Sequence, residues 1–138
     1  LRLVDMGVQP YLVASALIGI IAQRLVRMLC QECKEEFYLE DPAEMRLLGV
    51  EEPTYIFKAR KGGCKACGGT GYKGRTAIHE VLIAQYNVKE IVVHGGTTAD
   101  IKEQAVKNGT KLLRDNVADL VIDGKSTMEE LIKATYSI

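Results

Sequence analysis

Several features are scarce or absent in this sequence, and each absence argues against one class of function. There is no tryptophan, and aromatic residues make up only 6% of the chain, which argues against a platform for stacking nucleic-acid bases. Eighteen basic residues balance eighteen acidic ones, so no dominant nucleic-acid or anionic-membrane surface is expected. The longest apolar run, residues 11–21, is shorter than the roughly 20 residues that span a bilayer.

Nucleotide chemistry has no visible machinery in these residues. The glycines of 62–63 and 68–71 do not form a phosphate loop, because no Gly-x-x-x-x-Gly-Lys-[Ser/Thr] occurs. The two histidines, His79 and His94, are interpreted as structural or surface residues, and no catalytic residue is predicted. The chain opens Leu-Arg-Leu-Val-Asp without a methionine and reads as the tail of a helix, so we expect preceding sequence.

The sequence does contain two Cys-x-x-Cys pairs of identical spacing. In a chain with no secretion signal, such pairs favour a metal site over disulfides. Two pairs supply four thiolates, the closed shell of a structural zinc site, although iron fits the same sulfurs. Free buried cysteines or a redox pair are the alternatives. The predicted ligands are Cys30, Cys33, Cys64 and Cys67.

Apolar spacing and turn residues predict the fold. The three- and four-residue steps from Leu12 to Met28 predict a helix of about five turns, buried over its first half. Asp41-Pro42-Ala43-Glu44 predicts the start of a small helix that Gly49 ends. The segments 36–39, 55–57 and 75–82 are predicted strands, and helices are expected near 88–93, 98–105, 111–122 and 128–136, with Asn87, Thr98 and Ser126 as N-caps. The predicted fold class is mainly α with a small α/β metal-binding insertion.

One cationic group remains open to two interpretations. Arg24 and Arg27 lie three residues apart, on one face of the predicted first helix, with Gln23 beside them. A solvated or salt-bridged face is one interpretation. The other is that Gln23, Arg24 and Arg27 face a phosphate or a neighbouring subunit.

Taken in order, four stretches resemble the C-terminal part of the type II secretion and type IV pilus assembly ATPases. They cover nearly the whole chain. The stretches are Arg2 to Ser15, Ile21 to Cys30 with Cys33, Gly63 to Thr76 followed by His79 to Leu82, and Leu112 to Asp115 followed by Gly124 to Leu131.

This resemblance implies a hexameric motor of the RecA-like P-loop class whose nucleotide core is absent from these residues. ATP and Mg²⁺ would act only in the intact parent, and the four cysteines would match the family's tetracysteine domain. The resemblance also implies a cytoplasmic protein, peripheral at the inner membrane through a platform protein, with no nucleic-acid partner. The implied divisions are 1–29 for the last helices of the core, 30–76 for the metal subdomain and 77–138 for a C-terminal strand and helices.

Two other functions fit part of the pattern. Cys64-Lys65-Ala66-Cys67-Gly68-Gly69-Thr70-Gly71 resembles the repeat of Hsp40 zinc chaperones, but Lys34-Glu35-Glu36 replaces the glycines after the first pair. A nucleic-acid-binding zinc ribbon is the second alternative, disfavoured by the zero net charge and scarce aromatics.

Overall fold

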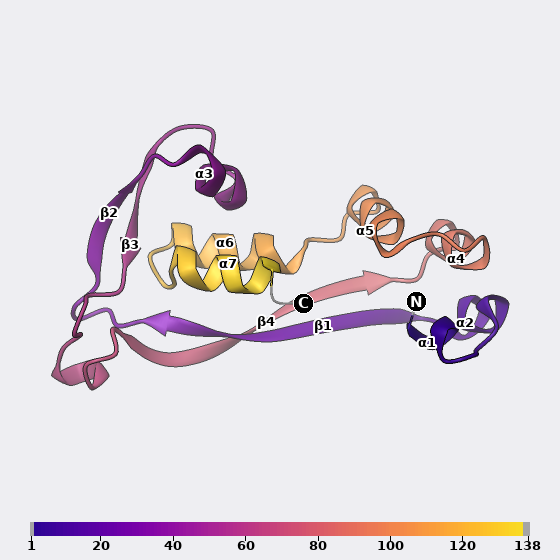
Figure 1. The fold of residues 1–138 in the computed structure, drawn as a ribbon, viewed down its shortest axis with the longest axis horizontal. Coiled ribbons are helices and arrows are strands. Elements are labelled where there is room, and N and C mark those ends of the chain that lie inside the picture. Colours follow the sequence, from indigo (N-terminus) through magenta and orange to yellow (C-terminus); the bar gives the residue numbers. More distant parts are fainter. Residues whose placement is uncertain (1, 137–138) are drawn as a thin grey trace. The chain divides into compact units, whose positions relative to one another are not determined.

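The computed structural model describes residues 2–136, in which two short helices precede a segment of strands around a third helix, and four further helices follow that segment (Figure 1). The helices among these residues are α1 (Arg2–Asp5), α2 (Pro10–Ala16), α3 (Pro42–Leu48), α4 (Tyr86–Val93), α5 (Thr98–Lys107), α6 (Leu113–Ile122) and α7 (Met128–Tyr136). The strands are β1 (Gly19–Leu29), β2 (Glu35–Leu39), β3 (Thr54–Lys58) and β4 (Tyr72–Ile83), and η1 (Lys65–Cys67) is a short 3₁₀ turn. The expected helices after residue 40 and the small α/β insertion are therefore present, whereas the expected first helix is not.

The strands form two separate two-stranded sheets. β1 pairs with β4, and β2 pairs with β3 in antiparallel register. In the second sheet Phe37 lies opposite Ile56 and Tyr38 opposite Tyr55. Because side chains alternate along a strand, Leu39 and Ile56 share the inner face, where both are buried. α3 connects these two strands and begins and ends as predicted, since Asp41 Oδ1 accepts from the Ala43 amide at 2.8 Å.

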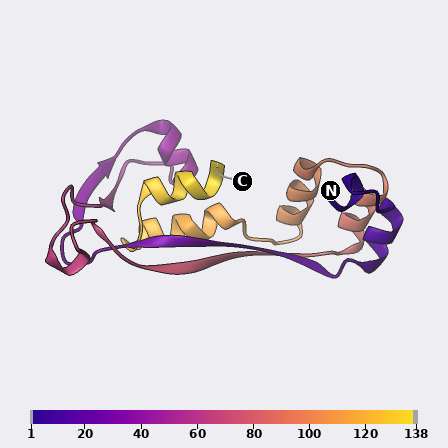
Figure 2. The same ribbon diagram turned by 60° about the horizontal axis from the view of Figure 1, so that its bottom comes forward.

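The chain divides into two compact units. Unit 1 comprises Leu1–Ala22 and Glu80–Leu112, and unit 2 comprises Gln23–His79 and Leu113–Ile138. Leu82, Val88 and Ala105 form the apolar core of unit 1. In unit 2, α6 and α7 lie side by side (Figures 1 and 2) and pack with the β2–α3–β3 segment around Val117, Val121 and Leu131. The division of the chain into residues 1–29, 30–76 and 77–138, drawn from the sequence, stays a prediction.

The predicted long first helix is wrong. α2 ends at Ala16, Leu17 is extended with ψ 124°, and the chain continues as β1 from Gly19. The first half of the predicted helix is also not largely buried, because Ala14 is the one buried residue of α2. The run from Ile18 to Leu29 contains four β-branched residues, which suits a strand. Its partner β4 lies about fifty residues away in the sequence.

Three N-caps also differ from the prediction by one or two residues. Thr97, not Thr98, caps α5: its Oγ1 accepts from the Asp100 amide, while Asp100 Oδ2 accepts from the Thr97 amide. This carboxylate contact lowers the pKa of Asp100. Thr127 Oγ1 accepts from the Glu130 amide at the start of α7, and Gln85 precedes α4 without a side-chain cap. Across residues 2–136, none of the helices is both long enough and apolar enough to cross a bilayer.

Candidate metal centre

All four cysteines lie where strands of unit 2 end or begin. Cys30 directly follows β1, and its amide donates to the Gly71 carbonyl at 3.0 Å, just before β4. The Lys34 amide donates back to the Cys30 carbonyl at 3.1 Å, so the first pair forms a closed turn. Cys64 directly precedes η1 and Cys67 is its last residue, after which Gly68 adopts a left-handed conformation at φ 66°. The paired strands therefore bring two local turns, distant in sequence, to one point.

The sulfur spacings match a single tetrahedral ion. All four Sγ atoms lie within 4.8 Å of one another. The Sγ–Sγ distance is 3.7 Å for Cys30 and Cys64, and 3.9 Å both for Cys33 and Cys67 and for Cys64 and Cys67. A zinc–sulfur bond of about 2.3 Å gives a tetrahedron whose edge is about 3.8 Å. A disulfide needs sulfurs about 2.05 Å apart, so the pairs are thiols rather than bridges.

Backbone amides are oriented toward one of these sulfurs. The Cys64 and Gly71 amides both donate to Cys67 Sγ at 3.2 Å. These hydrogen bonds favour the thiolate and lower the pKa of Cys67 to about 6. Burial and the neighbouring thiols raise the pKa of Cys33 to about 12 in the absence of a cation. A metal dication favours thiolates at all four positions, so the donor set fits zinc.

Glycine at position 63 is required by the space around Cys67. Its φ is +57°, and a Cβ there would lie 2.7 Å from Cys67 Sγ and 2.6 Å from the Gly69 carbonyl carbon. We expect Gly63→Ala to displace the second cysteine turn and weaken zinc affinity by at least about tenfold, measured by competition with a chromophoric chelator.

Gly62 provides the matched control for this substitution. It also has a positive φ, +82°, but a Cβ there meets nothing within 4 Å. Gly62→Ala should therefore cost only backbone strain, of order 1 kcal/mol, and leave zinc affinity near that of the parent. Equal zinc affinities for the two variants would show that the close approach at Gly63 does not matter for the site.

The first cysteine turn is anchored to the connection between α6 and α7. The Gly124 carbonyl accepts from Gln31 Nε2 at 3.2 Å and from Lys34 Nζ at 3.0 Å. The Leu29 amide donates to the Lys125 carbonyl at 2.8 Å. These contacts hold the metal ligands against the helical part of unit 2, and a sequence pattern of two cysteines does not predict them.

The arginine group predicted on one helix face lies instead on a strand. Arg24 and Arg27 both belong to β1. Residues an odd number apart in a strand point to opposite faces, so the prediction that these two arginines share a face is wrong. Gln23 Oε1 lies 2.9 Å from His79 Nε2. A phosphate- or subunit-facing role for Gln23, Arg24 and Arg27 stays a prediction.

Arg27 makes an internal network that the sequence did not reveal. Its Nε donates to Glu130 Oε1 at 2.8 Å, and its amide donates to Glu130 Oε2 at 2.9 Å. Its guanidinium lies 3.8 Å from the centre of the Tyr72 ring, and Tyr72 Oη is 3.0 Å from Thr127 Oγ1. Burial lowers the pKa of Arg27, but the hydrogen bond and charge of Glu130 outweigh it and raise that pKa. A buried glutamate within an apolar helical pattern was the available signal.

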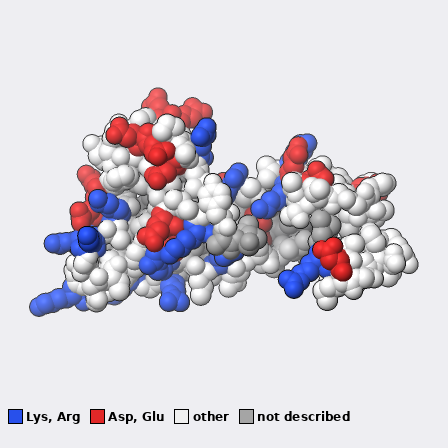
Figure 3. Space-filling model, viewed as in Figure 1, with Lys and Arg blue, Asp and Glu red and all other residues white. Residues whose placement is uncertain are grey.

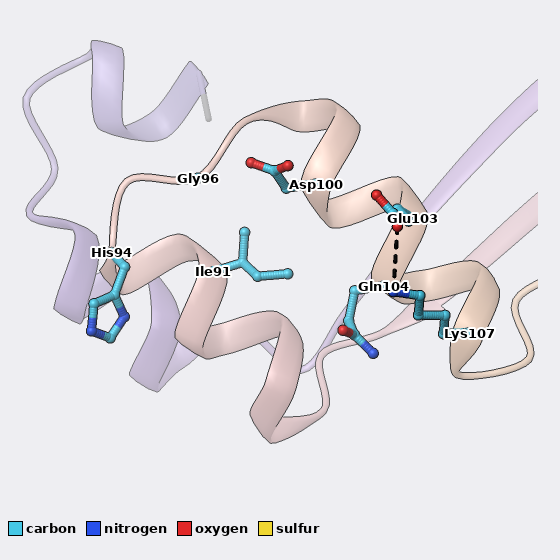
Figure 4. A pocket seen from close by; sticks show the side chains of 7 residues that line it. All are labelled: Ile91, His94, Gly96, Asp100, Glu103, Gln104 and Lys107. Atoms are coloured by element: carbon cyan, nitrogen blue, oxygen red, sulfur yellow. Dashed lines mark ion pairs between the residues drawn. The ribbon is translucent and has the colours of Figure 1, made fainter.

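Unit 1 contains a separate hollow between α4 and α5 (Figure 4). Its volume is about 370 Å³, and His94 lies at one edge. The charged groups around it already have partners, since Glu103 pairs with Lys107 at 3.3 Å and Asp100 completes the α5 capping box. The His94 ring lies 2.8 Å from the Glu90 carbonyl. The cysteine cluster is therefore the stronger candidate site.

Comparison with known proteins places the chain in a family. Residues 1–133 match the model of the type II/IV secretion system protein family. The chain is 44% identical over 137 residues to the type IV pilus assembly ATPase PilB of Thermus thermophilus. It is 38% identical to the type II secretion system protein E of Pseudomonas aeruginosa, and 37% identical to the type II secretion system ATPase E of Vibrio cholerae.

Each of these matches covers 97% of the chain but only part of the relative. The chain spans 15% of the Thermus protein and 26% of each of the other two. The matched region is therefore only part of each of these relatives. On the extent of the family match and these identities, the chain belongs to the type II/IV secretion system protein family.

Proposed function

We propose that the chain is the metal-stabilised portion of a hexameric traffic ATPase that powers type II secretion or type IV pilus assembly. It supplies a structural zinc lobe and surfaces for subunit packing, while a RecA-like core elsewhere in the protein binds ATP and Mg²⁺. The observation that carries the proposal is the convergence of Cys30, Cys33, Cys64 and Cys67 in a chain that matches this family over residues 1–133.

In this proposal zinc has a structural role. Four thiolates close its coordination shell, which leaves no position for a reacting water. Zinc bound there joins the turn after β1 to the turn before β4, and the hydrogen bonds to the Gly124 carbonyl extend that joint to α6 and α7. The chain's own residues thus hold a lobe in shape, and we expect the 138 residues by themselves not to hydrolyse ATP.

The proposed setting follows from the names of the relatives. A pilus or secretion ATPase works with an assembly machine, so the partners proposed are further copies of the protein and an inner-membrane platform protein. The proposed location is the cytoplasm, peripheral at the inner membrane through those partners. The family resemblance supports these assignments, which apply to the whole protein.

The test compares the full-length protein with a variant that lacks two ligands, Cys64→Ser with Cys67→Ser, and with the surface variant Lys102→Ala as control. We expect the double variant to bind no zinc and its rate of ATP hydrolysis to fall at least about tenfold. Cells that carry it should lose secretion or pili. Lys102 is exposed in unit 1, so its replacement should leave all three readouts intact. Zinc loss with full hydrolysis and full secretion or piliation would overturn the structural role.

A further inference from the structure

Unit 2 separates its acidic and basic residues into consecutive segments. Residues 35–52, which we call the acidic arm, comprise β2, α3 and the loop after it, and contain one basic residue, Arg46. The acidic residues of the arm are Glu35, Glu36, Glu40, Asp41, Glu44, Glu51 and Glu52. The chain's zero net charge therefore conceals a strongly uneven distribution.

The neighbouring segment has the opposite charge. Residues 58–75, which we call the basic face, run from the end of β3 through the second cysteine turn into β4. No acidic residue occurs between positions 53 and 79. The basic residues of the face are Lys58, Arg60, Lys61, Lys65, Lys73 and Arg75. Four zinc-bound thiolates carry a net charge of about −2, which leaves the face positive.

The charges of the two surfaces are not neutralised by each other within unit 2. All thirteen side chains are exposed except Glu44, which is half-buried. Within residues 2–136, no ion pair joins the arm to the face. Figure 3 shows acidic side chains gathered over the region of α3, and basic side chains toward the other end of the same unit, where some acidic side chains lie beside them. Each surface is therefore available to a partner of opposite charge.

The acidic arm also presents an aromatic anchor. Tyr38 and Tyr55 lie opposite each other on the outer face of the β2–β3 sheet, with ring centres 4.9 Å apart. They remain 45% and 65% exposed. Exposed tyrosines are enriched at the centres of protein interfaces, and an arginine stacks well on a tyrosine ring. Arg60 and Arg75 on the basic face are exposed and chemically matched to them.

We propose that the acidic arm of one copy of the protein docks on the basic face of the next copy. The two surfaces differ, so the contact is head-to-tail, and such contacts propagate around a ring or along a filament. A second copy is the occupant favoured by the observations. Glu35 and Lys58 already lie opposite each other across β2 and β3 of one copy, but within residues 2–136 no ion pair joins the other acidic side chains of the arm to the basic face. Those charges would oppose each other when copies meet. The proposal does not rest on the motor function.

Photo-cross-linking tests this contact directly in the full-length, zinc-loaded protein. A benzoyl-phenylalanine replaces Tyr55, and equal amounts of unlabelled and ¹⁵N-labelled protein are mixed before irradiation. We expect cross-linked peptides that join position 55 of one isotope to residues 58–75 of the other. Their yield should fall at least about fivefold between about 50 mM and 500 mM salt, because exposed charges are screened over a few ångströms at the higher salt.

A charge exchange identifies the partner surface. The arm-reversed variant carries Glu36→Lys, Glu40→Lys and Glu52→Lys, and the face-reversed variant carries Lys58→Glu, Arg60→Glu and Lys61→Glu. In each variant by itself, the yield of the inter-copy cross-link should fall at least about fivefold. A mixture of the two variants should restore that yield. Zinc content near one per chain checks that each variant folds.

Any of three results would overturn the proposal. The first is the absence of inter-copy cross-links to residues 58–75 in the unmutated protein, and the second is cross-links insensitive to both reversals. The third is a basic face that binds vesicles containing anionic phospholipid, loses that binding on reversal, and gives no cross-link between copies. Inter-copy cross-links in a full-length protein that does not hydrolyse ATP would support the contact while counting against the motor function, so the two failures are distinguishable.

Discussion

Replacement of Cys30 by serine should abolish zinc binding and unfold the metal lobe locally. Cys30 is fully buried, its Sγ lies 3.7 Å from that of Cys64, and its amide donates to the Gly71 carbonyl. A hydroxyl does not replace a thiolate in a four-sulfur shell, and apparent zinc-binding free energies of about 10–16 kcal/mol in small zinc domains show how much folding depends on the ion. We expect the zinc content to fall from one per chain to none.

The effect should be confined to part of unit 2. α6 and α7 pack through Val117, Val121 and Leu131, in a core cluster that contains none of the four cysteines, so they should keep their protection from hydrogen exchange. Residues 60–71 should lose theirs. Hydrogen exchange with mass spectrometry, alongside metal analysis, measures both.

Gln31→Ala is the control within the same turn. It removes the hydrogen bond from Gln31 Nε2 to the Gly124 carbonyl but leaves four thiolates in place. This variant should retain one zinc and the exchange protection of residues 60–71. If Cys30→Ser binds zinc as tightly as the parent, Cys30 is not a ligand and the tetrahedral site is wrong.

The cysteine cluster was predictable because most of its information is local. A Cys-x-x-Cys turn brings two sulfurs together within four residues, and the four-ligand preference of zinc then predicts that two such turns meet. The small helix after Asp41 was predictable for the same reason, since its N-cap, Pro42 and Gly49 lie within nine residues. What the sequence did not show was the anchoring of the first turn to Gly124, about ninety residues away.

The first long helix failed as a prediction because two periodicities overlap there. Leu12, Val13 and Ala16 belong to a helix, but Ile20, Leu25 and Met28 continue the same spacing by chance within a strand. Only pairing with β4 decides between the two, and that partner is remote in sequence. The misassigned element also misplaced Arg24 and Arg27 on one face, whereas a strand places them on opposite faces.

Arg27→Met should destabilise unit 2 by about 2 kcal/mol, less than the cost of breaking a fully buried ion pair, because the Arg27 side chain is 36% exposed. Glu130 is only 6% exposed, and Arg27 supplies it with both a side-chain and a backbone hydrogen bond. Removing the guanidinium leaves a buried carboxylate without its main countercharge and removes the stacking on Tyr72. Urea unfolding of the zinc-loaded chain measures the loss.

The double variant Arg27→Met with Glu130→Leu separates the ion pair from simple packing. Replacing both partners removes the uncompensated charge, so we expect at least half of the lost stability to return. Arg27→Lys should fall between the parent and Arg27→Met, because lysine keeps the charge but not the planar contact with the Tyr72 ring. If the double variant is less stable than Arg27→Met, the two side chains stabilise unit 2 through their packing and not through their charges. Recovery would instead show that the stability lost in Arg27→Met comes from the uncompensated charge of Glu130 at the contact between β1 and α7.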